Sequence, residues 1–365
     1  MPPRMHLACT FVQTAPTPKS LAFLAKRIDE RLVLLLDAEL ERWSAFDPDL
    51  AEPIQEIARL VLAGGKRLRP AFTYWGFVGA GGQPDDPAVI DAGGAFELMH
   101  AFALFHDDVM DDATSRRGAL TTHTTFARHH EDGHWAGEAR RFGDGVAILV
   151  GDLAFVYADQ LMTGASPQAW AIWNELRVEL NIGQVLDILG GARNDRRRDK
   201  AERICRYKSG KYTIERPLHL GAVMAAPERQ AELLPVLSAY GLPLGDAFQM
   251  RDDVMGAFGD EALTGKPVGG DLREGKPTPL LARAVEAASA PQLAVLDMVG
   301  RPGLTDDQVA RIQQVIVDTG ALADLETTIT RLTDEALAAI EIAPLVTEAR
   351  DELVQLAHYV SWRQV

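Results

Sequence analysis

The sequence has only two cysteines, Cys9 and Cys205, among its 365 residues. Two thiols so far apart form neither a disulfide framework nor a metal-binding pair, and such scarcity is typical of a reducing compartment. We therefore expect a cytoplasmic protein. The sequence also has no apolar run near the roughly 20 residues that span a bilayer. Its best candidate, VAILVGDLAFVYA at 146–158, is interrupted by Asp152, so no stable membrane insertion is expected.

Basic residues are in deficit. Asp and Glu number 52 against 37 for Lys and Arg, which leaves a formal net charge of −15. A surface of that sign repels nucleic acid, and we expect no nucleic-acid partner. Hydrophobic residues make up 47% of the chain, which is enough for a sizeable core. Residues 1–19 are rich in proline and too polar for a secretory signal, so they are expected to form a flexible N-terminal tail.

The sequence also lacks a series of the alternating apolar and polar residues that indicate strands, whereas helical periodicity is widespread. Apolar residues recur at three- and four-residue spacing in segments such as 21–43, 53–65 and 305–320. The longest stretches that we expect to be irregular are 113–145 and 193–200, and neither has the composition of a domain linker. We therefore expect one all-α domain over residues 20–365.

A dense acidic cluster follows one of these helical segments. HDDVMDD carries Asp107, Asp108, Asp111 and Asp112 directly after 95–105, which is apolar almost all round and indicates a helix buried on every side. On that helix Asp107 and Asp111 are four residues apart and project from one face. Oxygen ligands without nearby Cys or His favour a hard cation, Mg²⁺ before Zn²⁺. A solvated acidic turn at a helix end is the alternative interpretation.

A second acidic pair supports the metal site. The tetrapeptide DDVM recurs at 252–255 after another apolar helical segment, and it places Asp252 and Asp253 near a second helix end. Basic residues in glycine-rich settings accompany the two clusters: Lys66, Arg67, Arg69, Arg116, Arg117, Lys208, Lys211, Lys266 and Lys276. Carboxylates that hold Mg²⁺, together with separate cationic side chains, fit a site for diphosphate groups. An acidic protein can therefore bind an anionic substrate.

Six segments, in the order GGKRLRP, HDDVMDDATSRRG, GQVLD, YKSGKYT, QMRDDVMGAFGD and GKPVGGDLREGK, resemble those of the trans-isoprenyl diphosphate synthases. This family includes the farnesyl and geranylgeranyl diphosphate synthases, and the resemblance covers roughly residues 60–281. It implies an all-α fold of antiparallel helices around a central cavity, usually as a homodimer. It also implies a short-chain prenyltransferase that uses isopentenyl and allylic diphosphates, with three Mg²⁺ ions per active site and Mn²⁺ as a substitute.

The resemblance implies roles for the residues at matching positions. The expected catalytic residues are Asp107, Asp108, Asp111, Lys208, Ser209, Gln249, Asp252 and Asp253, of which Asp107, Asp111 and Asp252 are the metal ligands. The expected substrate-binding residues are Lys66, Arg69, His100, Arg116, Arg117, Gln184, Lys266 and Lys276. Within that second set, those that match the isopentenyl diphosphate site are Lys66, Arg69, His100 and Arg117. Gln184 and Asp187 match a motif that faces the cavity.

Such a site implies a reaction without a side-chain nucleophile. Metal ions and basic side chains stabilise the departing diphosphate as an allylic carbon–oxygen bond ionises. The pocket holds the isopentenyl double bond against the resulting cation and excludes water. In the family, the released diphosphate takes the proton whose loss completes chain extension.

The residues just before the first cluster bear on product length. Phe102 lies five residues, about 7.5 Å of helix rise, before Asp107, and the small Ala103 follows it. In the family this pattern resembles one type of geranylgeranyl diphosphate synthase, so we expect a C20 product. A farnesyl diphosphate synthase, with a C15 product, is the alternative for the enzyme, and a purely structural core role is the alternative for Phe102.

One position departs from the family pattern. Gly256 stands where many relatives have the last aspartate of the second motif, which predicts weaker binding of the third metal ion with activity retained. A class I terpene cyclase and a non-catalytic partner subunit of another prenyl synthase are the remaining alternatives. The histidine-rich HHEDGH at 129–134 is interpreted as a loop rather than a zinc site, because Gly133 interrupts its helical spacing.

Overall fold

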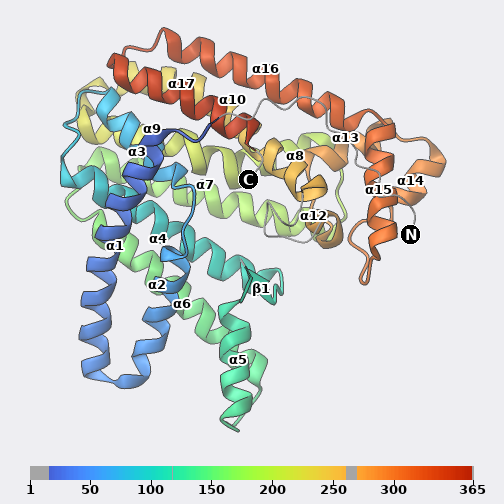
Figure 1. Ribbon diagram of the computed structural model, residues 1–365, viewed down its shortest axis with the longest axis horizontal. Helices are drawn as coiled ribbons and strands as arrows, with labels where there is room; N and C mark the ends of the chain where they lie inside the picture. Colours follow the sequence, from blue (N-terminus) through green and yellow to red (C-terminus); the bar gives the residue numbers. More distant parts are fainter. Residues whose placement is uncertain (1–15, 117, 260–268, 364–365) are drawn as a thin grey trace.

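The computed structural model describes residues 16–116, 118–259 and 269–363, and it confirms the predicted all-α fold (Figure 1). The α-helices of these residues are α1 (Lys19–Phe46), α2 (Ala51–Leu62), α3 (Leu68–Gly79), α4 (Pro87–Met110), α5 (Thr122–Asp132), α6 (Ala139–Leu161), α7 (Pro167–Ala192), α8 (Arg198–Ile204), α9 (Arg216–Ala225), α10 (Gln230–Phe258), α12 (Gly270–Glu274), α13 (Pro279–Ala287), α14 (Ala290–Leu296), α15 (Asp306–Asp318), α16 (Ala321–Glu341) and α17 (Thr347–Trp362). The shorter elements are the 3₁₀ helices η1 (Pro48–Leu50) and η3 (Pro227–Arg229), the π-helix η2 (Cys205–Glu215) and an antiparallel hairpin of β1 (Ser115–Arg116) and β2 (Ala119–Leu120).

Helix ends follow the local sequence. α15 begins after Thr305, whose hydroxyl accepts from the Gln308 N–H at 3.3 Å while the Gln308 side chain accepts from the Thr305 N–H at 2.9 Å. This reciprocal capping box satisfies two backbone donors and confirms a helix within 305–320. α1 begins at Lys19, one residue before the predicted domain start. Residues 1–15 of the predicted tail lie outside the described part of the chain.

The prediction that 113–145 is irregular is wrong, because it contains α5 and the start of α6. α5 carries few apolar residues, so its sequence shows little helical periodicity. Its stability comes from packing: Phe126 is buried, and the ring of His130 lies 5.4 Å from Phe142 of α6. The loop interpretation of 129–134 is wrong for 129–132, which form the last turn of α5, and His129 there contacts Glu52 at 3.0 Å. It holds for 133–134, because α5 ends before Gly133.

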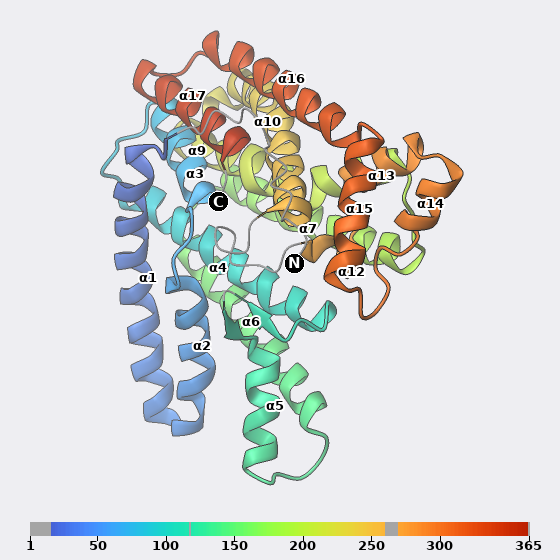
Figure 2. The same cartoon turned by 45° about the vertical axis from the view of Figure 1, so that its right-hand side comes forward.

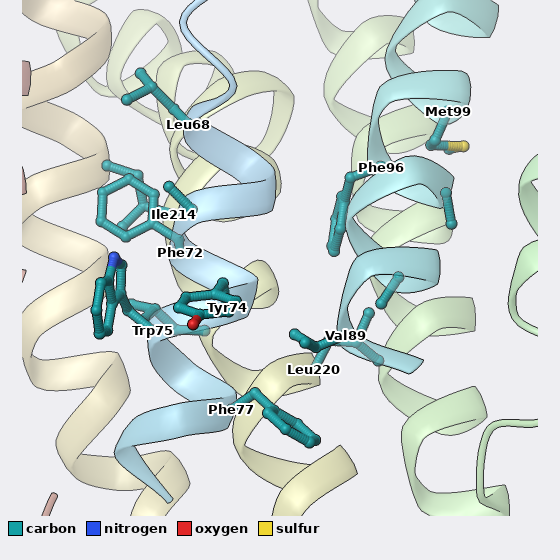
Figure 3. Close-up of a cluster of buried hydrophobic side chains, with 14 of the residues drawn as sticks. Leu68, Phe72, Tyr74, Trp75, Phe77, Val89, Phe96, Met99, Ile214 and Leu220 are labelled. Atoms are coloured by element: carbon teal, nitrogen blue, oxygen red, sulfur yellow. The ribbon is translucent and has the colours of Figure 1, made fainter. Parts of the chain in front are cut away.

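Two clusters of buried apolar side chains form the core. The larger one joins α3 and α4 to α1, α7, α9 and α17, and Figure 3 shows part of it where α3 faces α4. Within it, Phe96 of α4 meets Trp173 of α7 edge-on, with ring centroids 5.3 Å apart. The smaller cluster lies among α12, α13, α15 and α16. α10 and α16 contribute side chains to both clusters, so the two are mechanically connected.

α4 is a central helix of the bundle. Among the described residues it alone is long and apolar enough to cross a membrane, and 67% of its apolar window is buried inside the protein. Its apolar character is therefore accounted for by the core. α1 and α2 run beside one another at one end of the molecule, α16 and α17 lie side by side along another edge, and α5 protrudes (Figures 1 and 2). The carboxyl end of α4 is less buried than its middle: Asp108 is buried, whereas Met110 and Asp111 are exposed.

Candidate active site

The carboxyl end of α4 carries Asp107 and Asp111 one helical turn apart. The Asp111 N–H donates to the Asp107 carbonyl at 2.8 Å, so the helical turn continues through Asp111. Burial raises the pKa of both carboxyls; the positive charge of Lys208 opposes the shift at Asp107, and those of Lys276 and Lys208 oppose it at Asp111. Asp107 is half-buried and Asp111 is exposed. Two acids at this spacing repel one another when both are ionised, and a bound cation removes that repulsion.

Lys208 of η2 lies between the first cluster and α7. Its Nζ is 2.6 Å from Oδ2 of Asp187. Although burial opposes the charged form, Asp107 and Asp187 raise the pKa of Lys208, so the ammonium is retained. The close approach of η2 to α7 requires Gly183, because a Cβ there would lie 2.7 Å from the Lys208 Cα. π-Helical segments often occur at functional sites, and this one also carries Ser209.

Asp108 binds the β-hairpin. It is buried, and its Oδ1 accepts from Nε and Nη2 of Arg116 at 2.8 and 2.6 Å. Arg116 therefore lies beside the first cluster. The residue that holds it is Asp108, which is expected to support the metal ligands. Arg117 and Lys266, both predicted to bind substrate, lie outside the described residues.

The second cluster lies near the carboxyl end of α10. Gln249 donates to Oδ1 of Asp253 at 2.9 Å, whereas the buried Oδ2 of Asp253 has no hydrogen-bond partner among the described residues. Burial, then the charges of Asp271 and Asp252, raise the pKa of Asp253 well above its ordinary value. Asp252 is more exposed and forms an ion pair with Arg363.

Lys276 connects the two clusters electrostatically. Its Nζ lies 2.5 Å from Glu274 and 3.6 Å from Asp271. Although burial opposes its charge, the carboxylates of Asp271, Glu274 and Asp111 raise the pKa of Lys276. Carboxylates at the end of α4 and on α12 thus raise the pKa of Lys276. The positive charge of Lys276 in turn opposes the rise in the pKa of Asp253 on α10. Lys276 is therefore within electrostatic range of both acidic clusters.

Other predicted residues gather around η2 and α3. The Arg69 guanidinium lies 4.3 Å from the centroid of the Tyr212 ring and donates to the Thr213 hydroxyl at 3.2 Å. The His100 ring lies 6.4 Å from the same Tyr212 ring. Lys66 lies in the segment between α2 and α3. Three of the residues predicted to bind isopentenyl diphosphate thus come from α3, α4 and the segment that joins α2 to α3.

Arg67, in contrast, has a structural role. It is buried, pairs with Asp29 at 2.5 Å and with Glu97, and donates to the Val61 carbonyl at 2.7 Å. These bonds fix the segment before α3 and so orient the residues on either side of Arg67. Sequence reasoning singled out neither Tyr212, which supports Arg69, nor Arg363, which lies outside every motif.

The predicted chain-length pair lies on the half-buried part of α4. Phe102 packs against Phe155 of α6 at 4.9 Å between ring centroids, and against His106 at 4.6 Å. Ala103, four residues before Asp107, shares the helix face of that aspartate. On α7, the Gln184 amide lies 3.6 Å from the Met110 sulfur at the end of α4.

The donor set fits a metal that draws part of its coordination from substrate. Among the described residues, no three His, Cys, Asp or Glu side chains converge closely enough to hold an ion by themselves. Mg²⁺ commonly uses one or two carboxylates together with phosphate oxygens and water. The half-buried Asp107, the exposed Asp111 and the buried Asp253 match that pattern. The adjacent ammonium groups of Lys208 and Lys276 support it, because they neutralise carboxylates that a metal ion would otherwise bind.

Comparison with known proteins identifies the family. The family model described as polyprenyl synthetase matches residues 51–316, and the chain belongs to that family. It is 32% identical to the geranylfarnesyl diphosphate synthase of Aeropyrum pernix, over 88% of this chain and 97% of the relative. It is 30% identical to the nonaprenyl diphosphate synthase of Mycobacterium tuberculosis, over 90% and 83% of the two chains.

A solved structure agrees. The geranylgeranyl pyrophosphate synthase of Corynebacterium glutamicum, complexed with isoprenyl diphosphate and magnesium, superimposes with a TM-score of 0.87 at 35% identity, over 94% of this chain and 99% of that one. The protein is therefore a trans-prenyltransferase with the isoprenoid synthase fold. Its family is magnesium-dependent and acts on isoprenyl diphosphates. The relatives make products of different lengths, which family membership alone does not assign.

Proposed function

We propose that the protein condenses an allylic diphosphate with isopentenyl diphosphate and releases geranylgeranyl diphosphate as its main product. The observation that supports this most strongly is the placement of two lysines beside the acidic residues: Nζ of Lys208 lies 2.6 Å from Asp187, and Nζ of Lys276 lies 3.6 Å from Asp271. The charges of both lysines also act on Asp111. Two carboxylate clusters around one space suit a diphosphate bridged by metal ions, with basic side chains supplying the rest of the neutralisation.

In this proposal three Mg²⁺ ions bind with the allylic diphosphate, two at Asp107 and Asp111 and one at Asp252. Mg²⁺ held by these residues would supply positive charge that stabilises the departing diphosphate. Lys208, Arg116 and Lys266 hold the same diphosphate, and Lys276 lies within reach of both clusters. Ser209 and Gln249 line the space beside the cation. Asp108 and Asp253 orient their neighbours, while Gln184 and Asp187 face the cavity.

Isopentenyl diphosphate would bind to Lys66, Arg69, His100 and Arg117. The cation–π contact of Arg69 with Tyr212 holds the guanidinium in one orientation, which lowers the entropy lost on binding an anion. The substrate double bond is thereby held next to the allylic carbon, and the proton lost after bond formation passes to the released diphosphate.

Product length is proposed to depend on the paired rings of Phe102 and Phe155. Ala103 leaves room beneath Asp107 for a growing chain, whereas the two rings form a barrier between α4 and α6. The Arg177 guanidinium lies 5.0 Å from the centroid of the Phe155 ring and forms a cation–π contact with it. A barrier one and a half turns below the metal ligands favours C20 over C15.

We further propose a homodimer of single-domain subunits, each formed by residues 20–365, in a reducing cytoplasmic compartment. α6 and α7 expose a set of large apolar side chains: Ile148, Leu149, Val156, Val178, Ile182, Val185, Ile188 and Leu189. The spacing of 178, 182, 185 and 189 places those residues on one helix face. An exposed apolar face of this kind marks an interaction surface, and a second copy of the chain can cover it isologously.

The test is the product of the purified protein with Mg²⁺, isopentenyl diphosphate and each of the C5, C10 and C15 allylic starters in turn, read by mass spectrometry after phosphatase treatment. A C20 alcohol as the main product is expected. A C15 alcohol would keep the reaction and overturn the product assignment. A cyclic hydrocarbon, or no elongation of any starter, would overturn the proposed function in favour of a cyclase or a partner subunit.

A further inference from the structure

η2 contacts residues of both proposed diphosphate sites. Near its start, Nζ of Lys208 lies 2.6 Å from Oδ2 of Asp187. Further along, the Tyr212 ring centroid lies 4.3 Å from the Arg69 guanidinium, and the Thr213 hydroxyl accepts from Arg69 at 3.2 Å. One π-helix of 11 residues therefore carries a lysine of one site and holds an arginine of the other.

Three residues on one face of α7 hold this π-helix. Glu179, Gly183 and Asp187 are spaced by four residues, so they lie along the same side of α7. Asp187 pairs with Lys208, and a Cβ on Gly183 would meet the Lys208 backbone. Glu179 pairs with Lys211. Carboxylates of α7 thus bind both lysines of η2, with a direct backbone contact between the two pairs.

The Glu179 carboxylate is buried and uses both of its oxygens. Its Oε1 accepts from Lys211 and, at 2.7 Å, from Nη2 of Arg216, and its Oε2 accepts from Nε of Arg216 at 2.7 Å. Arg216 begins α9 directly after η2. Although burial opposes ionisation, the hydrogen bonds from Arg216 and Lys211 lower the pKa of Glu179, so it stays charged at neutral pH. One buried anion therefore binds both η2 and the residue that follows it.

η2 also packs directly against α10. A Cβ on Gly245 would lie 2.7 Å from the Cα of Gly210, and a Cβ on Gly241 would lie 2.9 Å from the Cα of Glu215. Backbone meets backbone at both places, and a close-packed interior leaves no room for η2 to shift toward α10 there. The pairs with α7 then determine how η2 is oriented.

We infer that η2 is a shared support for the two proposed diphosphate sites and that Glu179, acting through Lys211, is a positioning residue for both. The inference rests on the proposed function, which assigns Lys208 to the allylic diphosphate and Arg69 to isopentenyl diphosphate. Lys211 lies between Lys208 and Tyr212 in η2, so its pair with Glu179 fixes the backbone that joins them. π-Helices of this length are rare, and this one depends on its neighbours to keep its geometry.

Glu215 indicates what happens when Glu179 is lost. Its Oε1 accepts from the Ser238 hydroxyl at 2.7 Å, whereas its buried Oε2 has no hydrogen-bond partner among the described residues. That Oε2 lies 3.7 Å from Nζ of Lys211. A buried ammonium without Glu179 gains a partner by moving toward this oxygen. Because Lys211 belongs to the same short helix as Lys208, its movement displaces the backbone that carries both sites.

The test measures the two sites separately by calorimetry on the full-length protein. Inorganic diphosphate with Mg²⁺ is the probe of the Lys208 site. Isopentenyl diphosphate, added to protein already saturated with inorganic diphosphate and Mg²⁺, is the probe of the Arg69 site. Glu179→Gln keeps the shape of the side chain but removes its charge, and it should weaken binding of both probes about five- to tenfold, or roughly 1.0–1.4 kcal/mol.

Two variants serve as comparisons. Glu175→Gln changes an exposed glutamate one turn earlier on α7 and should leave both affinities within about twofold. Thr213→Val removes only the hydroxyl that accepts from Arg69, so it should weaken isopentenyl diphosphate alone. A purely structural role for Glu179 would lower the number of binding-competent molecules and leave the affinity of each one unchanged. Calorimetry reports these two quantities separately.

Lys211→Met keeps the inference testable if Glu179→Gln folds poorly, because Glu179 then retains both bonds from Arg216. It should weaken both probes by a similar factor. The double variant should bind no more weakly than Glu179→Gln alone, since both changes break the same pair.

A folded Glu179→Gln or Lys211→Met, as judged by circular dichroism, would overturn the inference if it bound both probes as tightly as the unmodified protein or lost affinity for only one of them. Calorimetry with these probes requires no turnover. Prenyl elongation by the unmodified protein is scored separately, so failure of the proposed function is distinguishable from failure of this inference.

Discussion

Arg363, which follows α17, forms an ion pair with Asp252 of the second acidic cluster. The arginine is buried, its guanidinium lies 4.2 Å from the centroid of the Phe248 ring, and it also donates to the Val360 carbonyl. Asp252 is the expected ligand of the third metal ion. The metal-free protein therefore neutralises this carboxylate with its own cation, and a metal ion that binds Asp252 competes with Arg363.

Removing that competition should strengthen metal binding. Arg363→Gln is expected to lower the Mg²⁺ concentration for half-saturation about three- to tenfold in the presence of inorganic diphosphate, a change of roughly 0.7–1.4 kcal/mol. The variant should also lose about 1.5–3 kcal/mol of stability, because hydrogen bonds to a charged group are removed. Calorimetry and urea unfolding measure the two effects. Arg363→Lys retains the charge and is the control; weaker Mg²⁺ binding in Arg363→Gln would mean that the arginine supports the ion.

Substitutions within the first cluster should differ in their effect on kcat, because only some of its aspartates are expected to hold metal. Asp107→Asn is expected to lower kcat about 10²- to 10³-fold, since it removes a group that holds the charge-stabilising ion. Asp112 is a matched control from the same acidic run: it is exposed and pairs with Arg140 at 3.2 Å on the surface. Asp112→Asn should leave kcat within about twofold. Equal losses in the two variants would contradict the assignment and point to a general effect of acidic charge.

The features that can be predicted from the sequence depend on residues that are close together in the chain. Asp107 and Asp111 follow an apolar helical segment, and the i, i+4 rule alone places them one turn apart, as the Asp111-to-Asp107 backbone bond confirms. α15 was predictable for the same reason, because its Thr305 cap is encoded within three residues.

Tertiary contacts account for what the sequence does not predict. The partners Arg363 and Asp252 are separated by 111 positions, and no periodicity or spacing rule connects them. Asp271 lies within a recognisable segment, but its approach to Gly256 depends on how α12 packs against α10. α5 lacks a periodic apolar pattern, and its burial against α6 substitutes for that pattern. Each of these features brings together residues that are far apart in the sequence, so it could be identified only from the structure.

Asp253 should give the metal-free protein an unusual pH dependence. Burial raises its pKa, so the folded state holds a proton that the unfolded state has already released. Its contribution to stability is therefore present below the unfolded pKa and is lost as the pH rises toward the higher folded pKa. In EDTA at pH 8, Asp253→Asn should be about 1–3 kcal/mol more stable than the unmodified protein, with a smaller difference at pH 5.5.

Urea unfolding at the two pH values measures this difference. Asp246 is the control, because burial also raises its pKa but its carboxylate pairs with Arg206 at 2.5 Å. Asp246→Asn breaks that pair and should lose stability at pH 8. If Asp253→Asn were also destabilised in EDTA at pH 8, Asp253 would have to be ionised and partnered in the metal-free protein.

The apolar face of α6 and α7 predicts the position of the subunit interface. Ile182→Glu places a charge at the centre of this face and should convert a dimer into monomers in sedimentation velocity. Leu34→Glu is the matched control, because Leu34 is also a large exposed apolar residue, at 69%, but lies on α1. This variant should leave the dimer intact. A monomeric unmodified protein, or a dimer that survives Ile182→Glu, would exclude this face as the interface.

The contact between Phe102 and Phe155 predicts how product length can be changed. Phe102→Ala removes a ring from the barrier and should shift the main product beyond C20, and Phe155→Ala should shift it in the same direction, because the two rings pack together at 4.9 Å. Ala103→Phe fills space on the Asp107 face and should shorten the product to C15.

Mass spectrometry of the dephosphorylated products reads these changes directly. Phe105→Leu is the matched control on the same helix: its side chain is buried in the main core, so the change should lower stability by roughly 1 kcal/mol and leave product length unaltered. If Phe102→Ala and Phe105→Leu both leave the C20 product unchanged, Phe102 is a core residue and the barrier lies elsewhere. If Phe102→Ala alone lengthens the product, the half-buried face of α4 determines where chain growth stops.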